Sequence, residues 1–189
     1  MLLDEGKLEI EAPDPMDAEK ASGHAAIEGH GNICRILVAN NADPNSPMID
    51  PPILTLIITE YYANKGQTEG IPEVFDLLVE LGAHVNAENL EGVPVLIHAI
   101  NEHQNNVFAH RLLDRQDTDV KAVDPNNNGS LDNAAVRGHR ALVELLAEKE
   151  ADVKQVNTLG ETPLCSAVPN YEIIRVLLET GAGILGGRL

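Results

Sequence analysis

The sequence is poor in aromatic residues: its 189 residues include no tryptophan, two phenylalanines and three tyrosines. This excludes a core built around one large aromatic cluster and favours a core of interdigitating aliphatic side chains. Cysteine is also scarce, with Cys34 and Cys165 as the two examples. A disulfide framework is therefore excluded, and a reducing compartment is expected. We predict that both cysteines behave as small buried hydrophobic residues.

Basic residues are few as well. The chain has 13 Lys and Arg against 30 Asp and Glu, for a formal net charge of −17. Nucleic-acid binding needs clusters of Lys and Arg, so this class of partner is excluded. The acidity favours attraction to a protein partner with a basic surface; the alternative interpretation is that it only keeps the chain soluble. No apolar run of 18 residues and no secretory signal are present, so no membrane contact is predicted, and a cytoplasmic or nuclear location is expected.

Catalytic and metal-binding motifs are missing from the sequence. Its seven histidines form no His-Glu-x-x-His pattern, and its cysteines form no Cys-x-x-Cys pair. His98, His103 and His110 are spaced so that they do not share one helical face. Gly-x-Ser-x-Gly, Gly-x-Gly-x-x-Gly and P-loop motifs are absent. We therefore expect no enzyme activity, no cofactor and no metal.

A short closing turn recurs along the chain, each time after an apolar run. Its equivalent positions are Asp43, His84, Asp119, Asp152 and Gly183, at steps of 41, 35, 33 and 31 residues. Apolar residues before each turn recur at i, i+3 and i+4, which predicts an amphipathic helix. Alanine-rich segments further upstream predict a second helix that neighbours can approach closely. A single helix pair cannot bury its own apolar face, so stacked pairs must bury it jointly.

The last repeat opens with a distinctive series: Gly160, Thr162, Pro163, Leu164 and Ala167. Here Thr162 is expected to cap a helix whose first residue is Pro163. With the Gly-His link before the second helix of the preceding repeat and the closing turns, this series resembles the ankyrin repeat, in particular fungal-type multi-repeat arrays. The resemblance covers nearly the whole chain. It implies an all-α solenoid of helix–turn–helix units joined by short hairpin-like turns.

Three repeats depart from the Thr-Pro-Leu-His opening of the family. The replacements are Lys20-Ala21-Ser22-Gly23, Pro94-Val95-Leu96-Ile97 and Gly129-Ser130-Leu131-Asp132. Each one loses a helix cap, so these junctions are expected to be softer, although Gly129 is an acceptable substitute cap.

We divide the single domain 1–189 into about five repeats with a partial one before them. The ranges are 1–14 (partial), 15–45, 46–88, 89–123, 124–156 and 157–189 (truncated). The repeat at 46–88 holds a predicted inserted loop, residues 60–71, for which a lengthened first helix is the alternative. The loop is either a tolerated surface loop or a contact loop with Tyr61 and Tyr62 as anchors. Both ends of the array lack polar caps, which favours self-association or neighbouring repeats beyond them.

The resemblance implies a non-catalytic protein–protein interaction module that binds a partner on a concave face of hairpin tips and first helices. The alternative is a fragment or accessory array of a larger signalling or enzymatic multidomain protein. The tip residues predicted to contact a partner are Leu90, Glu91, Val93, Pro125, Asn126, Asn128, Thr158, Leu159 and Glu161. Those predicted from the helices are Glu28, Thr59, Asn101, Glu102, Arg137 and Asn170.

Leu90 and Leu159 stand beside acidic residues in this set. If both are exposed, they suit a partner patch of apolar residues ringed by Lys or Arg. The competing interpretation is that they only pack on neighbouring tips.

Overall fold

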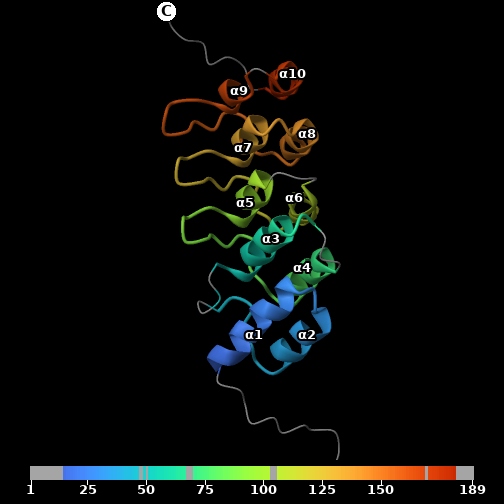
Figure 1. The fold of residues 1–189 in the computed structure, drawn as a ribbon. Helices are drawn as coiled ribbons and strands as arrows, with labels where there is room; N and C mark the ends of the chain where they lie inside the picture. The colour runs from blue at the N-terminus through green and yellow to red at the C-terminus, as the bar shows by residue number, and fades with distance from the viewer. Residues whose placement is uncertain are drawn as a thin grey trace, which may run out of the picture.

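The described part of the chain is a stack of five helix pairs in the computed structural model (Figure 1). The structure describes residues 15–46, 49, 51–66, 70–102, 106–168 and 170–181. The predicted all-α solenoid is confirmed there, while the partial repeat 1–14 and the glycine-rich end 182–189 lie outside the described residues. The pairs are α1 (Pro15–Ile27) with α2 (Gly31–Ala39), α3 (Ile53–Ala63) with α4 (Ile71–Glu80), α5 (Val95–Asn101) with α6 (Val107–Leu113), α7 (Ser130–Val136) with α8 (Arg140–Glu148), and α9 (Pro163–Ser166) with α10 (Tyr171–Glu179).

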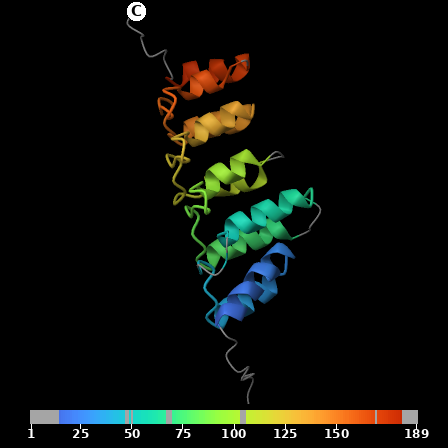
Figure 2. The same cartoon turned by 60° about the vertical axis from the view of Figure 1, so that its left-hand side comes forward.

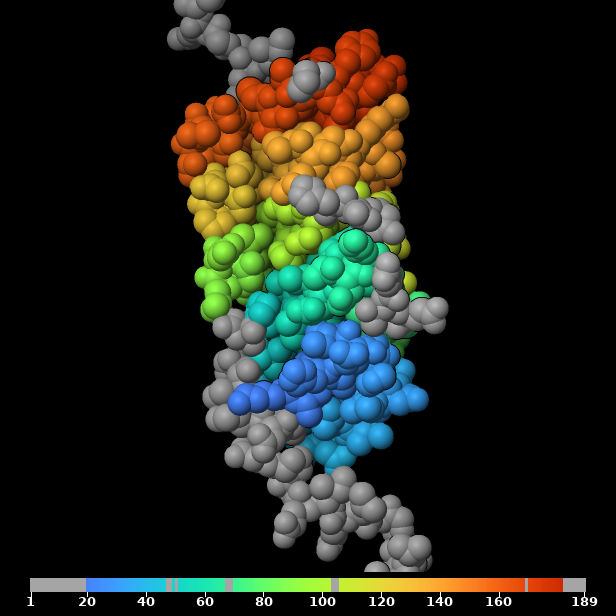
Figure 3. Space-filling view, viewed as in Figure 1, coloured from blue at the N-terminus to red at the C-terminus, as the bar shows by residue number. Residues whose placement is uncertain are grey.

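The helices form two layers. The first helices of the pairs lie side by side in one layer, and the second helices lie in the other (Figures 1 and 2). The first helices have odd numbers, α1 to α9, and the second helices have even numbers, α2 to α10. Hairpin-like tips project from one edge of the stack, and two of them close with isolated bridges, Glu88 to Pro94 and Val123 to Gly129. The space-filling view shows the helix pairs stacked without interruption along the array (Figure 3).

Aliphatic side chains make most of the core, as expected. Leu78, Leu112, Leu146 and Leu177 of the second helices are fully buried. Burial of such a side chain contributes roughly 1.5–3 kcal/mol. The pairs therefore hold each other through interlocking apolar faces, and no described pair has a core of its own.

An aromatic cluster is nevertheless present, contrary to the prediction from composition. Four of the five aromatic rings meet where the second and third repeats pack. Tyr61, Tyr62 and Phe75 all contact Phe108, with ring centroids 5.0 to 5.9 Å apart. The edge-on geometry of the tyrosine contacts is favourable for aromatic pairs. Few aromatic residues were enough because they are gathered at one junction.

The predicted insertion in the second repeat is partly helical. Helix α3 continues to Ala63, so the first four residues of the predicted loop belong to the lengthened first helix. The last residue of that loop, Ile71, is buried and begins α4. The extra helical turn carries Tyr61 and Tyr62 onto Phe108, which explains why the added residues are tolerated.

Asparagine side chains bridge the first two junctions at the closing turns. Asn45 donates from Nδ2 to the carbonyl oxygen of Gly82 at 2.8 Å and accepts at Oδ1 from the N–H of His84 at 2.7 Å. Asn86 makes the same pair of bonds, both 2.8 Å, to the closing turn of the third repeat. One side chain thus satisfies a backbone donor and a backbone acceptor of the next repeat.

Lysine replaces this asparagine in the next two turns, as Lys121 and Lys154. At the last junction the bridges move to the hairpin tips. The tip bonds run from Thr158 N to Asn126 O at 2.9 Å and from Asn157 Nδ2 to Asn128 Oδ1 at 3.0 Å. The first two junctions are therefore bridged by side chains of the closing turns, and the last junction is bridged at the hairpin tips.

Two local predictions need correction. Cys34 is buried as expected, but Cys165 is exposed. Thr162 precedes α9, yet its hydroxyl makes no capping bond and lies 3.8 Å from Cys165 Sγ.

The stacking makes a prediction about neighbouring leucines in α10. Leu177 is 0% exposed and Leu178 is 45% exposed. Leu177→Ala should lower the free energy of unfolding by about 3 kcal/mol, because it leaves a cavity between α10 and α8. Leu178→Ala, the matched control, should lower it by less than about 1 kcal/mol. Urea unfolding followed by far-UV circular dichroism measures both, and equal losses would contradict this packing.

Candidate functional site

The hairpin tips of the last three repeats are built alike. In each tip one side-chain oxygen accepts backbone N–H bonds from the residues two and four positions further on, at 2.9 to 3.0 Å. The acceptors are Asn89, Asp124 and Asn157, residues whose short polar side chains favour such turns. Gly92 and Gly160 follow in the left-handed backbone region. The tips are therefore rigid turns that hold their outward residues in fixed positions.

Two leucines stand out from these rigid tips. Leu90 is 84% exposed and Leu159 is 79% exposed. The interpretation that they only pack on neighbouring tips is therefore wrong. Pro125 and Asn126 are exposed on the tip between them. Large apolar side chains held on ordered turns mark a surface suited to protein contact.

Polar side chains connect adjacent first helices across the same side of the stack. Three contacts join α3 to α5, α5 to α7, and α7 to α9. They are Thr59 Oγ1 with His98 Nε2 at 3.0 Å, Arg137 Nε donating to Asn101 Oδ1 at 3.4 Å, and Ser166 Oγ donating to Asp132 Oδ1 at 3.3 Å. We call the hairpin tips together with these exposed sides of the first helices the tip-side face.

Two hollows lie on the tip-side face. One, of about 350 Å³, lies between α5 and the tip of the third repeat (residues 89–92), which we call the third tip. It is lined by Pro51, Asn89, Leu90, Glu91 and His98. The other, of about 360 Å³, lies beside α7 and is lined by Asn101, Asn128, Asp132, Asn133, Val136 and Arg137. Five of the predicted contact residues line these two hollows, from positions up to 47 residues apart.

Most of the other predicted contact residues are accessible around the hollows. Thr59 and Glu102 both contact His98. Val93 is half-buried. The exposed ones are Glu28 at the end of α1 and Pro125, Asn126, Thr158 and Glu161 on the tips.

Some predicted contact residues also have structural roles. Asn170 caps α10, since its Oδ1 accepts from the N–H of Ile173 at 3.2 Å. Asn128 is held by Asp124 and Asn157 at the tips. The rings of Tyr61 and Tyr62 are half-buried against Phe108 and contribute to the fold, and their role as anchors of a contact loop stays a prediction.

Sequence reasoning missed His98, Asp132, Asn133 and Val136 as members of this face. The sequence alone suggests His98 only as a metal ligand, and Asp132 only as a departure from the helix opening. The available signal is register: Asn133 and Val136 are three residues apart and therefore share one side of α7, next to the buried Ala134 and Ala135.

His98 is influenced by two carboxylates near the first hollow. Its Nε2 is 3.9 Å from Glu102 Oε1, and Glu91 lines the hollow with it. Burial lowers the pKa of His98, although Glu102 and Glu91 act in the opposite direction. The ring is therefore neutral at neutral pH, and the hollow has negative charge from Glu91.

Asp132 is a buried carboxylate at the base of the second hollow. It is 1% exposed, and its Oδ2 accepts from the N–H of Gly129 at 3.1 Å, so Gly129 does serve as the substitute cap. Burial raises the pKa of Asp132 from its ordinary 3.8 to about 6, against the hydrogen bonds from Gly129 and Ser166. The side chain links the start of α7 to α9.

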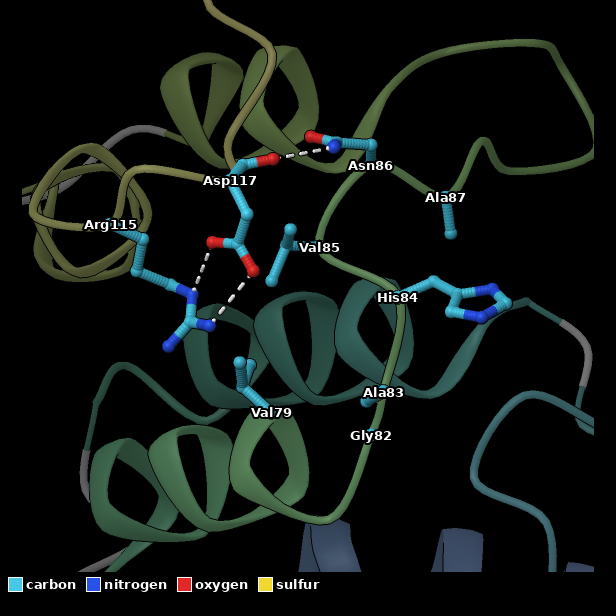
Figure 4. Close-up of a pocket in the computed structure, with 9 residues that line it drawn as sticks. All are labelled: Val79, Gly82, Ala83, His84, Val85, Asn86, Ala87, Arg115 and Asp117. Atoms are coloured by element: carbon cyan, nitrogen blue, oxygen red, sulfur yellow. Dashed lines mark hydrogen bonds and ion pairs between the residues drawn. The ribbon is translucent and has the colours of Figure 1, made fainter.

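A further cavity, of about 470 Å³, lies between the closing turns of the second and third repeats (Figure 4). Its polar residues bond each other: Arg115 donates to Asp117 at 2.9 and 3.0 Å, and Asn86 donates to the carbonyl oxygen of Asp117. Figure 4 shows His84 pointing away from this ion pair. These groups stabilise the junction and have no catalytic arrangement.

Within the described ranges, no three His, Cys, Asp or Glu residues are grouped so that they could hold a metal ion. None of the helices described is both long and apolar enough to cross a bilayer. The site is a surface of rigid tips and shallow hollows.

Stacked helix pairs with hairpin tips define this chain as a helical repeat protein. Residues 96–185 match the family model for ankyrin repeats (3 copies). YahD of Escherichia coli (strain K12), named as an ankyrin repeat protein, is 31% identical over 114 residues, which cover 56% of this chain and 55% of that protein. Residues 96–185 are therefore similar to ankyrin repeats, and the chain spans about half the length of this relative.

Asp132 makes stability depend on pH. Its pKa is higher in the folded chain than in the unfolded one, so the folded state binds the proton more tightly and loses stability as the pH rises through that range. Compared with Asp132→Asn, the wild-type free energy of unfolding should fall by about 2 kcal/mol between about pH 4 and about pH 7. Urea unfolding at closely spaced pH values measures the difference. The Asp132→Asn variant keeps all other carboxylates, so their contribution cancels in the comparison. If the difference in free energy of unfolding between the two proteins did not change with pH, the raised pKa of Asp132 would be refuted.

Proposed function

We propose that this chain is a non-catalytic interaction module that binds a protein partner on its tip-side face. Ankyrin repeats are generally protein–protein interaction modules, and the family match supports this class. The observation that carries the proposal is the pair of exposed leucines on rigid tips, Leu90 and Leu159. Because the turns are already ordered, a partner that covers these leucines gains apolar burial at little cost in conformational entropy.

The partner is expected to present apolar residues ringed by Lys or Arg. Acidic side chains surround the two leucines, with Glu91 beside Leu90 and Glu161 beside Leu159. The overall charge of −17 would also speed association with a basic surface. The tip-side face offers shape and charge for recognition. Its described residues are not arranged as a nucleophile, an acid–base pair or a cofactor site.

Self-association is a second candidate, favoured by a different set of exposed residues. Ile33 and Ile36 of α2 and Leu178 of α10 are exposed, in the first and last described pairs. End-to-end contact would bury them and would also suit an accessory role inside a longer array. Solution mass should then rise with concentration, and Ile36→Ser should reduce that rise. A constant monomer mass would remove this candidate.

Leu90→Ser combined with Leu159→Ser should weaken partner binding at least about tenfold per leucine, since each loses apolar burial of over about 1.4 kcal/mol. The partner is first identified by cross-linking and mass spectrometry with the wild-type chain, and affinities are then measured by calorimetry.

Val168→Ser combined with Tyr171→Ser is the matched control, because it removes two exposed apolar residues that belong neither to the tips nor to the residues of the self-association candidate. Far-UV circular dichroism should show equal helicity in all three proteins. Undiminished affinity of the tip variant would refute the assignment of the tip-side face.

A further inference from the structure

The hollow between the third tip and α5 has a shape suited to a single side chain. Its volume of about 350 Å³ is close to the roughly 300 Å³ at which ligand pockets begin. Pro51 comes from the second repeat, and the other lining residues come from the third, so stacking of the two repeats creates the hollow. Leu90 and Pro51 supply apolar wall, while Glu91 supplies a carboxylate.

The negative charge of this hollow is not balanced by its own lining residues. Those residues include no Lys or Arg. His98 does not neutralise the glutamates, because its burial favours the uncharged ring. The Glu102 carboxylate, 3.9 Å from His98 Nε2, lies outside the lining and adds to the negative charge around it. A cation that enters the hollow would therefore meet the Glu91 carboxylate of the tip.

The walls of the hollow are fixed in place before any partner arrives. His98 Nε2 is engaged with Thr59 Oγ1 at 3.0 Å, which holds the ring between α3 and α5. Asn89 accepts two backbone bonds within its own tip, which fixes the position of Leu90 and Glu91. A site of this kind loses little entropy on binding.

The second hollow provides a natural contrast. It has almost the same volume, about 360 Å³, but Arg137 is one of its lining residues. A basic side chain there would meet a like charge, whereas the hollow at the third tip would attract it. The two hollows on one face thus differ in charge and not in size.

We propose that the hollow lined by Pro51, Leu90, Glu91 and His98 receives one Arg or Lys side chain of the protein partner. The aliphatic stem of that side chain lies against Leu90 and Pro51, and its cationic end lies at the Glu91 carboxylate. This inference rests on the proposed function and specifies what the partner must present at the third tip.

The probe is N-acetyl-argininamide, added to the isotopically labelled full chain in about 150 mM salt, where distant charges are screened. Nuclear magnetic resonance should show saturable shifts at the amides of the 89–92 tip and at the His98 ring. N-acetyl-citrullinamide, its uncharged isostere, should cause no saturable shift there. Glu91→Gln should weaken binding of the arginine probe about fivefold, and Glu88→Gln, on the same hairpin but outside the hollow, should leave it unchanged.

Equal shifts with both probes, or arginine shifts spread over the acidic surface and insensitive to Glu91→Gln, would overturn the inference. Because this experiment needs no partner, its failure is separate from failure of the proposed function, which the leucine variants test. If the leucine variants lose partner binding but the hollow does not bind the arginine probe, the proposed function stands and the proposed Arg or Lys site is removed.

Discussion

The whole structure depends on the inability of one helix pair to bury its own apolar face. Leu78, Leu112, Leu146 and Leu177 are fully buried and belong to one apolar cluster that runs through the described pairs. Stacking therefore has to be continuous, and any repeat that departs from the family pattern must still present its apolar stripe. The lost Thr-Pro openings are tolerated for this reason, and at Gly129 the buried carboxylate of Asp132 replaces the missing cap.

Stacking also decides where function can lie. The packed layers occupy one side of every helix, so the free surfaces are the tips and the outer sides of the two layers. On the second helices, Arg140 is paired with Glu144 and Glu172. Arg111 likewise meets Glu73 and Asp76. On the tip-side face, the glutamates of the tips and Arg137 beside α7 define the charge that a partner meets.

The two proposals describe this one face at different scales. Exposed leucines on two of the three rigid turns offer apolar contact along the tips, while the hollow at α5 offers one charged position. Hot spots of protein interfaces commonly combine a central anchor with a surrounding rim that excludes water. The Asn89 turn joins the two, because it holds Leu90 and Glu91 side by side.

The repeat period, the amphipathic helices and the tip leucines could be predicted from the sequence alone, because each depends on contacts between residues close in the chain. Only the tertiary structure brought Tyr61 onto Phe108, buried Asp132 beside Ser166, and placed His98 in one hollow with Glu91. Most of these contacts join different repeats, or join a tip to a helix. Their energies depend on burial, which the local sequence does not determine.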